Sequence, residues 1–263
     1  MPAPQAEPEP FHDDDAGAKM SFLEHLDELR QRIIWSCLAV AGGVLVGFTF
    51  IDSIFAFIFE PTRRLLPEGS KLIYTQPGEA FSLYLQIALI AGIVLAAPVI
   101  MYQVWLFISP GLYRNEKMLA IPFVLMSTIG FVMGAAFNHY IVFPWMMSFF
   151  ASFNNPDLAF MPKLEDTFDL YTKMLLGMGL VFQMPTVVFF LAKIRILTWR
   201  FLWNNFKYAI LIIFIAAAVI TPSGDMVTQG IFAAPMIGLY IISIFVAWLV
   251  GPKRAALDAP DAA

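Results

Sequence analysis

The stretch AFSLYLQIALIAGIVLAAPVIMYQVWLFI, residues 80–108, contains no charged side chain. About 20 consecutive apolar residues of α-helix are needed to cross the hydrocarbon core of a bilayer. This stretch exceeds that length, and we therefore expect it to form a transmembrane helix.

Five further apolar runs accompany it, at residues 33–51, 118–149, 167–192, 208–220 and 230–250. Turn formers and charged residues separate the runs, as is typical of connections between spans. The connections are residues 61–67, 109–111, 154–156, 195–207 and 221–225. The chain is 59% hydrophobic and only 14% charged, whereas a soluble domain carries roughly 25% charged residues. The sequence thus predicts an all-α membrane protein with six transmembrane helices.

The run at 208–220 is too short for an ordinary span. Its 13 residues make about 20 Å of helix against roughly 30 Å of hydrocarbon. Two interpretations stay open: a short span that is sheltered by its neighbours or by a thinned bilayer, and a re-entrant segment.

Charge distribution predicts the orientation and the domain limits. Residues 1–19 are rich in Pro, Ala and acidic residues and are expected to form a disordered tail. The transmembrane domain then covers 20–250, and 251–263 form a cytoplasmic tail. With the N-terminus inside, eleven of the sixteen Lys and Arg residues fall on the cytoplasmic side, which favours both termini inside by the positive-inside rule.

The N-terminal helix is predicted to begin at a capping box, because Ser21 is followed three residues later by Glu24. An apolar stripe at helical spacing follows, made by Phe22, Leu26, Leu29 and Ile33. Such a stripe is typical of an amphipathic helix at the membrane surface. We expect it to run into the first span.

Enzyme motifs are missing from the sequence. It contains no HExxH, GxSxG or GxxxxGK[ST] pattern, a single cysteine (Cys37) and three dispersed histidines. We therefore expect no enzymatic activity, no metal site, no cofactor and no nucleic-acid partner.

Several segments resemble the TatC family, the C subunit of the twin-arginine translocase. They are SFLEHLDELRQR (21–32), APVIMYQVWLFISPGLYRNE (97–116), VFP (142–144), FQMP (182–185) and TP (221–222). They occur in the family's order from about residue 20 to 250. This ordered set identifies the chain as a member of the family.

The resemblance implies a receptor for folded proteins that carry an N-terminal signal with two adjacent arginines. It implies a concave bundle of six helices whose last two spans are short, in the cytoplasmic (inner) membrane. It also implies TatA/TatB-type single-span partners, self-association in a larger complex, and transport that is driven by the proton-motive force.

The candidate signal-binding residues lie at the predicted cytoplasmic edge. Two arginines present planar, permanently charged forks that carboxylates match in bidentate geometry. Glu28 and Glu116 match the family's signal-contacting glutamates, and Phe107 matches an aromatic residue beside the bound signal. Glu24 and Arg30 on the N-terminal helix complete the set.

Structural roles compete with these assignments. Glu28 can pair with Arg32, and Asp27 with Arg30, at helical spacing. Glu116 near the start of the third span is favoured there by the helix dipole. Phe107 can equally pack at the lipid edge.

Two amides, Gln86 and Gln183, are placed within predicted spans, where polar side chains face protein or water-lined surfaces. Many family members carry glutamate at the position of Gln183. Because an amide does not exchange a proton at physiological pH, we expect a hydrogen-bonding role instead. The acceptor is either a partner helix or signal, or another helix of the same bundle.

On the outer side, Pro61, Glu79 and Asp225 are expected to shape the cap. The turn at 221–225 reads TPSGD, one residue longer than the TPPD that is common in the family. Gly43 and Gly47, and likewise Gly130 and Gly134, have GxxxG spacing, which is a weak signal for helix packing.

Other functions fit the sequence less well. A secondary transporter predicts a central site with broken helices and internal repeats, and the sequence shows no clear repeat. A passive scaffold would assemble partners without binding a signal. An intramembrane enzyme lacks a nucleophile and base pair.

Overall fold

The computed structural model describes residues 22–66, 72–108, 120–155, 157, 160–221 and 225–251. The two predicted tails, apart from Gly251, and Glu116 lie outside these residues. The elements within them are α1 (Phe22–Thr49), α2 (Ile51–Arg63), α3 (Glu79–Ile108), α4 (Ala120–Phe137), the π-helical turn η3 (Asn138–Val142), α5 (Phe143–Ala151), α6 (Leu164–Val181), α7 (Met184–Lys193), α8 (Trp199–Asn204), α9 (Phe206–Ile220) and α10 (Met226–Val250).

The predicted helical membrane architecture is confirmed. Within the described residues, five helical segments are long and apolar enough to cross a membrane: Glu24–Thr49, Glu79–Ile108, Ala120–Ala151, Leu164–Lys193 and Met226–Val250. The short fifth run is α9, whose 15 residues make about 22 Å of helix, still less than the hydrocarbon thickness. The last helix, α10, has 25 residues, so that α9 alone of the final two helices is short.

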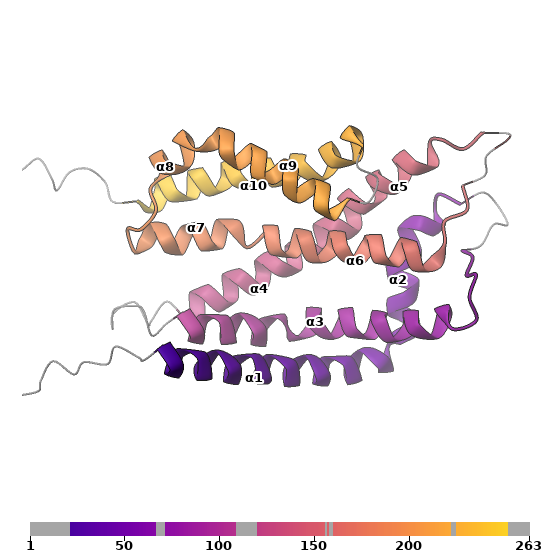
Figure 1. Ribbon diagram of the computed structural model, residues 1–263, viewed down its shortest axis with the longest axis horizontal. Helices are drawn as coiled ribbons and strands as arrows, with labels where there is room; N and C mark the ends of the chain where they lie inside the picture. The colour runs from indigo at the N-terminus through magenta and orange to yellow at the C-terminus, as the bar shows by residue number, and fades with distance from the viewer. Residues whose placement is uncertain are drawn as a thin grey trace, which may run out of the picture.

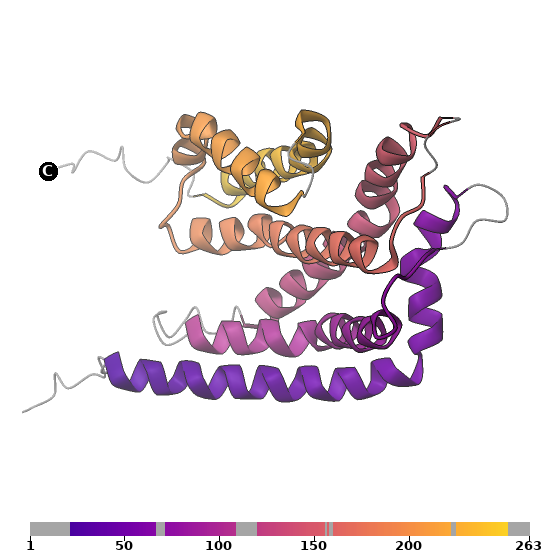
Figure 2. The same cartoon turned by 45° about the vertical axis from the view of Figure 1, so that its right-hand side comes forward.

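The long helices lie side by side with their ends at two faces of the molecule (Figure 1). At one face, which we call the N-terminal face, α1 begins, α3 ends, α4 begins, and α7 and α10 end. At the opposite face, the cap face, α2 stands across the end of α1 (Figure 2). The predicted cytoplasmic edge therefore corresponds to the N-terminal face.

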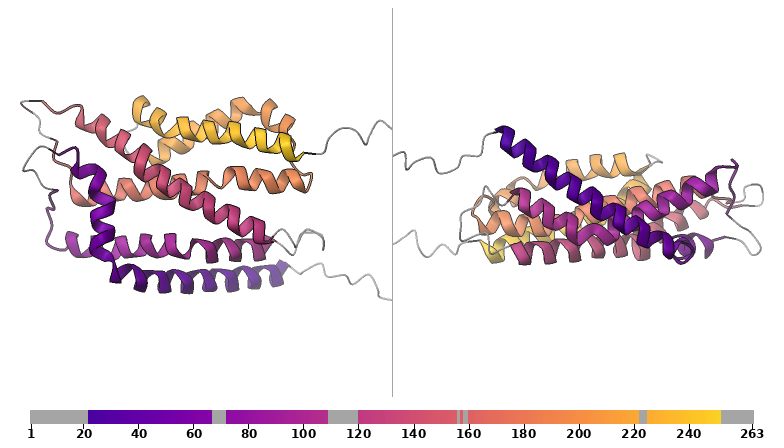
Figure 3. Two further views of the ribbon diagram at one scale, coloured as in Figure 1. Left: turned by 180° about the vertical axis from the view of Figure 1, so that it is seen from behind. Right: turned by 90° about the horizontal axis from the view of Figure 1, so that it is seen from below.

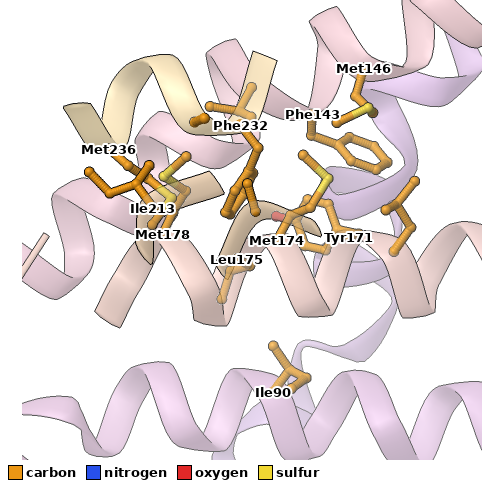
Figure 4. Close-up of a cluster of buried hydrophobic side chains, with 14 of the residues drawn as sticks. Ile90, Phe143, Met146, Tyr171, Met174, Leu175, Met178, Ile213, Phe232 and Met236 are labelled. Carbon is orange, nitrogen blue, oxygen red and sulfur yellow. The ribbon is translucent and has the colours of Figure 1, made fainter. Parts of the chain in front are cut away.

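Helix α1 is the most exposed of the long helices. It packs chiefly against α3 and crosses it obliquely on the outside of the molecule (Figure 3). In contrast, α6 lies centrally, and buried side chains from it meet α5, α9 and α10. This contact is the main core, whose labelled members include Phe143, Tyr171, Met174, Met178 and Phe232 (Figure 4).

Glycines set the closest helix contacts. A Cβ on Gly43 of α1 would lie 2.6 Å from the carbonyl oxygen of Gly92 on α3, and one on Gly134 of α4 would lie 2.6 Å from that of Met178 on α6. Gly130 approaches the Phe182 carbonyl in the same way, at 3.1 Å. The GxxxG spacings thus serve packing within this chain, where backbones come together without side chains between them.

Helix α2 was not predicted, and the interpretation of Pro61 as the start of a connection is wrong. Pro61 is buried in the last turn of α2, next to the buried Ile58, Phe59 and Thr62. Proline is accommodated because this short helix loses only one backbone hydrogen bond. The spacing of Phe55, Ile58, Phe59 and Thr62 is the amphipathic pattern that indicates the helix in the sequence.

Two predicted spans are interrupted rather than continuous. The run at 118–149 passes through η3 immediately before Pro144, and the run at 167–192 breaks at residues 182–183 before Pro185. A proline ring clashes with the carbonyl four residues earlier. The wider π turn and the break relieve this clash at Tyr140 and Val181 respectively.

Candidate functional site

The N-terminal face brings the start of α1 against the end of α3. The ring of His25 stacks on Phe107, with centroids 4.4 Å apart and planes inclined by 15°. This contact fixes Phe107 beside the first turns of α1, and therefore beside the candidate carboxylates. The role of His25 was not predicted from the sequence.

Glu28 is the most buried of the described carboxylates of α1 at this face. Its side chain is 12% exposed, and its Oε1 accepts a hydrogen bond from the guanidinium of Arg32 at 2.9 Å. The other oxygen, Oε2, is buried and has no hydrogen-bond partner among the described residues, and the same is true of Arg32 Nε. The predicted intrahelical pair of Glu28 with Arg32 is thus present, and it engages only one of the two carboxylate oxygens.

The remaining candidates on α1 are more exposed. Glu24 and Arg30 both lie on exposed surface of the helix. Asp27 and Arg30 do not form the predicted ion pair within the described part of the chain. At three residues apart on an exposed helix face such a pair contributes only a few tenths of a kcal/mol, so solvent competes with it effectively.

The segment that carries Glu116 joins the end of α3 at Ile108 to the start of α4 at Ala120. Glu116 itself lies outside the described residues. Both flanking helix ends, Ile108 and Ala120, are at the N-terminal face (Figure 1), the face at which α1 with Glu28 begins.

An aromatic cluster missed by the sequence analysis supports this face from within. Trp105 of α3, Phe123 of α4 and Phe190 of α7 are buried together, with ring centroids 4.9–5.7 Å apart. Such pairs contribute roughly 0.5–1.5 kcal/mol beyond burial alone. Three helices are therefore held together directly behind the ends that carry Phe107 and the 109–119 connection.

Gln183 lies at the junction of α6 and α7 and makes a hydrogen bond within the bundle. Its Nε2 donates to the backbone oxygen of Ser127 on α4 at 2.9 Å. Gln86 is half-buried on α3 and makes no hydrogen bond with other described residues. Among the described residues, Gln183 therefore makes an interhelical hydrogen bond and Gln86 makes none.

At the cap face, Glu79 joins two helices. Its side chain is fully buried, and Oε2 accepts hydrogen bonds from the backbone N–H groups of Thr75 (2.9 Å) and Gln76 (3.2 Å). Its Oε1 accepts the backbone N–H of Glu165 in the first turn of α6 at 3.3 Å, and Lys163 Nζ lies 3.9 Å from Oε2. One carboxylate thus holds the segment that leads into α3 and also accepts an N–H group of the first turn of α6, so that it links the two helices.

Asp225 has a local structural role. It is the N-cap of α10, and its Oδ1 accepts the backbone N–H groups of Val227 (3.0 Å) and Thr228 (2.9 Å). A further hydrogen bond, which the sequence analysis did not predict, joins α10 to α9: Gln229 Nε2 donates to the backbone oxygen of Phe214 at 2.7 Å.

Comparison with known proteins gives consistent matches over most of the chain. The family model for the Sec-independent protein translocase protein TatC matches residues 24–235. TatC of Koribacter versatilis (strain Ellin345) is 43% identical over 238 residues, covering 89% of this chain and 88% of that protein. TatC of Helicobacter pylori (strain J99) is 39% identical over 228 residues, covering 87% and 89%. A crystal structure of a twin-arginine translocase receptor, TatC, matches with a TM-score of 0.76 and 36% identity, over 86% of this chain and 99% of that one.

Proposed function

Because this chain belongs to the TatC family of Sec-independent protein translocase proteins, we propose that it binds twin-arginine signal peptides at its N-terminal face. The family is a translocase component and not an enzyme. We therefore look for a binding site, and the candidate residues of the N-terminal face support one there.

The half-used carboxylate of Glu28 carries this proposal. A buried carboxylate oxygen without a hydrogen bond is costly, because its desolvation is not compensated. Oε2 of Glu28 is in that state among the described residues, while Oε1 is held by Arg32. An arginine of a signal would supply the missing donor, and its planar fork suits a carboxylate better than a lysine does.

The second arginine is assigned to Glu116. This glutamate belongs to the connection between two helix ends at the same face, and the pair of arginines calls for two carboxylates. Phe107, stacked on His25, offers an apolar surface next to Glu28 for the residues that flank the arginines.

Titration with a fluorescent twin-arginine signal peptide tests the assignment. Removing the charge in Glu28→Gln or Glu116→Gln is expected to weaken binding by roughly tenfold each, the effect of one charge-assisted hydrogen bond. Glu60→Gln is the matched control, because Glu60 pairs with Arg64 at the same i,i+4 spacing on α2 at the opposite face. Binding that is unchanged in the double variant would refute the assignment.

A changed signal peptide distinguishes a passive scaffold from a receptor. A signal with both arginines changed to lysine is expected to bind much more weakly, because the ammonium group cannot make the bidentate contact. A scaffold would retain the two peptides equally.

The wider setting follows from the family and from charge. We place the protein in the cytoplasmic membrane with both termini inside, in a complex with TatA/TatB-type subunits and further copies of itself, driven by the proton-motive force. The excess of Lys and Arg on the predicted inner side supports this orientation. Labelling of single cysteines at positions 28 and 116 with a membrane-impermeant thiol reagent, in a Cys37→Ala background, tests it. Modification from opposite sides of the membrane would contradict the site.

A further inference from the structure

A hollow of about 540 Å³ lies between the α1–α3 pair and the α4–α6 pair, beneath α2. Its wall is almost entirely apolar, and small residues such as Gly47, Ala91, Ala135 and Ala136 form part of it. Ile90 and Leu175 line its two sides, on α3 and α6 (Figure 4). No local sequence pattern indicates this hollow, because it is assembled from four separate stretches of the chain, 46–58, 90–95, 132–140 and 171–175.

The hollow opens to the bilayer. Several residues that line it, including Val46, Leu95, Val132 and Tyr140, are exposed, so its wall is continuous with the lipid-facing surface of α1, α3 and α4. An apolar space holds water poorly, since water needs polar partners. Within the hydrocarbon layer the hollow must therefore be filled by apolar matter.

One polar pair marks the cap end of the hollow. His139 and Tyr171 are both buried and both line it, with Nδ1 of the imidazole 3.2 Å from the Tyr171 hydroxyl. Phe57 stacks on the imidazole, with centroids 3.8 Å apart. When the phenol donates to Nδ1, the proton of the ring is on Nε2, and Nε2 has no hydrogen bond with the described residues.

The depth of this pair matches a lipid ester. The span Leu164–Lys193 is longer than the hydrocarbon layer, and roughly 30 Å centred on it covers about residues 169–188. Tyr171 is then within about one helical turn of the cap-side boundary, where acyl chains meet their ester groups. Along α4 and η3 the hollow extends from Val132 to Tyr140, about 12 Å, which is close to the half-thickness of the hydrocarbon.

We propose that this hollow binds one acyl chain of a phospholipid from the cap-side leaflet, with His139 Nε2–H donating to the ester carbonyl. The chain fills the apolar wall over the depth of one leaflet. The imidazole gives the site a fixed polar end, which distinguishes a bound lipid from the lipids that merely surround the protein.

A transmembrane helix fits the space less well. A helix about 10 Å wide with a rise of 1.5 Å fills roughly 120 Å³ per residue. Even the whole empty space of about 1210 Å³, open mouth included, thus holds about ten residues, half of a span. A flexible hydrocarbon chain has no such minimum width.

Photolabelling of the wild-type protein in vesicles tests the proposal. The probe is a phosphatidylglycerol with a diazirine at the middle of one acyl chain, and labelled residues are located by mass spectrometry. Label is expected to concentrate several-fold on Val94, Ala135 and Leu175, relative to the outward-facing Leu125 and Ile129 of α4. Equal labelling of all lipid-facing surfaces would overturn the proposal.

A filled hollow provides the matched comparison. Ala136 is exposed and lines the hollow, whereas Ala41 is exposed on α1 and does not. Ala136→Phe is expected to lower the labelling of Val94 and Leu175 at least fivefold, and Ala41→Phe to leave it unchanged. If Ala136→Phe folds and Val94 and Leu175 are still labelled, the site is contradicted. If Ala136→Phe does not fold, the distribution of label on the wild-type protein tests the proposal.

The proposed hydrogen bond from His139 to the ester carbonyl is tested by comparing two probes. An ether-linked probe lacks the carbonyl acceptor and is expected to label the hollow of the wild-type protein several-fold less than the ester-linked probe. In His139→Phe the two probes are expected to label equally. Equal labelling by both probes in the wild-type protein would contradict the role of His139.

Discussion

Gly43 of α1 lies against Gly92 of α3 so closely that a Cβ on Gly43 would come within 2.6 Å of the Gly92 carbonyl oxygen. The obstacle is backbone, which cannot rotate away as a side chain can. Gly42, one position earlier, has open space where its Cβ would be. Two adjacent glycines therefore differ completely in what they allow.

We expect Gly43→Leu to destabilise the protein by about 2–3 kcal/mol, because overpacking forces the helices apart. Gly42→Leu is expected to stay within about 1 kcal/mol of the wild type, since it gains helix propensity and meets no obstacle. Thermal unfolding in detergent measures both. Equal stability of the two variants would show that α1 and α3 do not meet at Gly43.

Gln183→Leu is expected to cost about 0.5–1.5 kcal/mol, the range of interhelical hydrogen bonds in membranes. The lost contact is that from Nε2 to the Ser127 oxygen. Gln86→Leu is the control, since Gln86 makes no hydrogen bond within the described residues, and it should be close to neutral in the same unfolding assay. If export falls in Gln183→Leu while stability does not, Gln183 acts on a partner instead.

Glu79→Ala is expected to destabilise by roughly 2–3 kcal/mol, because it leaves the backbone N–H groups of Thr75, Gln76 and Glu165 without their charged acceptor. Glu165→Ala removes only a partly exposed ion pair with Lys163 and should cost less than about 1 kcal/mol. Limited proteolysis at the cap face provides a second measurement. It should accelerate in the Glu79 variant alone.

Asp225→Ala is expected to cost about 1 kcal/mol through loss of the N-cap of α10. Asp225→Asn keeps a side-chain oxygen for Val227 and Thr228 and should recover most of that stability. Unfolding midpoints of the two variants distinguish capping from a need for negative charge. If the asparagine variant is as unstable as the alanine variant, the position requires a negative charge and not only a capping oxygen.

The spans were predictable because a bilayer imposes one requirement, about 20 apolar residues, that a sequence displays directly. Helix α2 was missed because its 13 residues are amphipathic and end in charged residues, which resemble a connection. The prolines at 144 and 185 indicate that the helices are interrupted there, but they do not indicate which kind of interruption forms. Whether a proline bends, widens or ends a helix depends on its neighbours in space.

Single contacts in the candidate site were predictable where they are local. The pair Glu28–Arg32 follows from a spacing of four residues. The stack of His25 on Phe107 and the bond from Gln183 to Ser127 join distant segments, so no spacing reveals them. The family resemblance supplied the assignment of Glu28, Glu116 and Phe107. The geometry added that Oε2 of Glu28 has no hydrogen-bond partner among the described residues.

The hydrogen bond between Glu79 and the N–H of Glu165 spans 86 positions of the chain. During synthesis at about 5–20 residues per second, Glu79 leaves the ribosome roughly 4–17 seconds before its partner. Over that interval α3 can pack against α1, but the start of α3 at the cap face lacks its hydrogen bond to α6. The nascent chain must therefore tolerate an incomplete cap face, in which Oε2 of Glu79 can already bind Thr75 and Gln76 while Oε1 waits for its donor on α6.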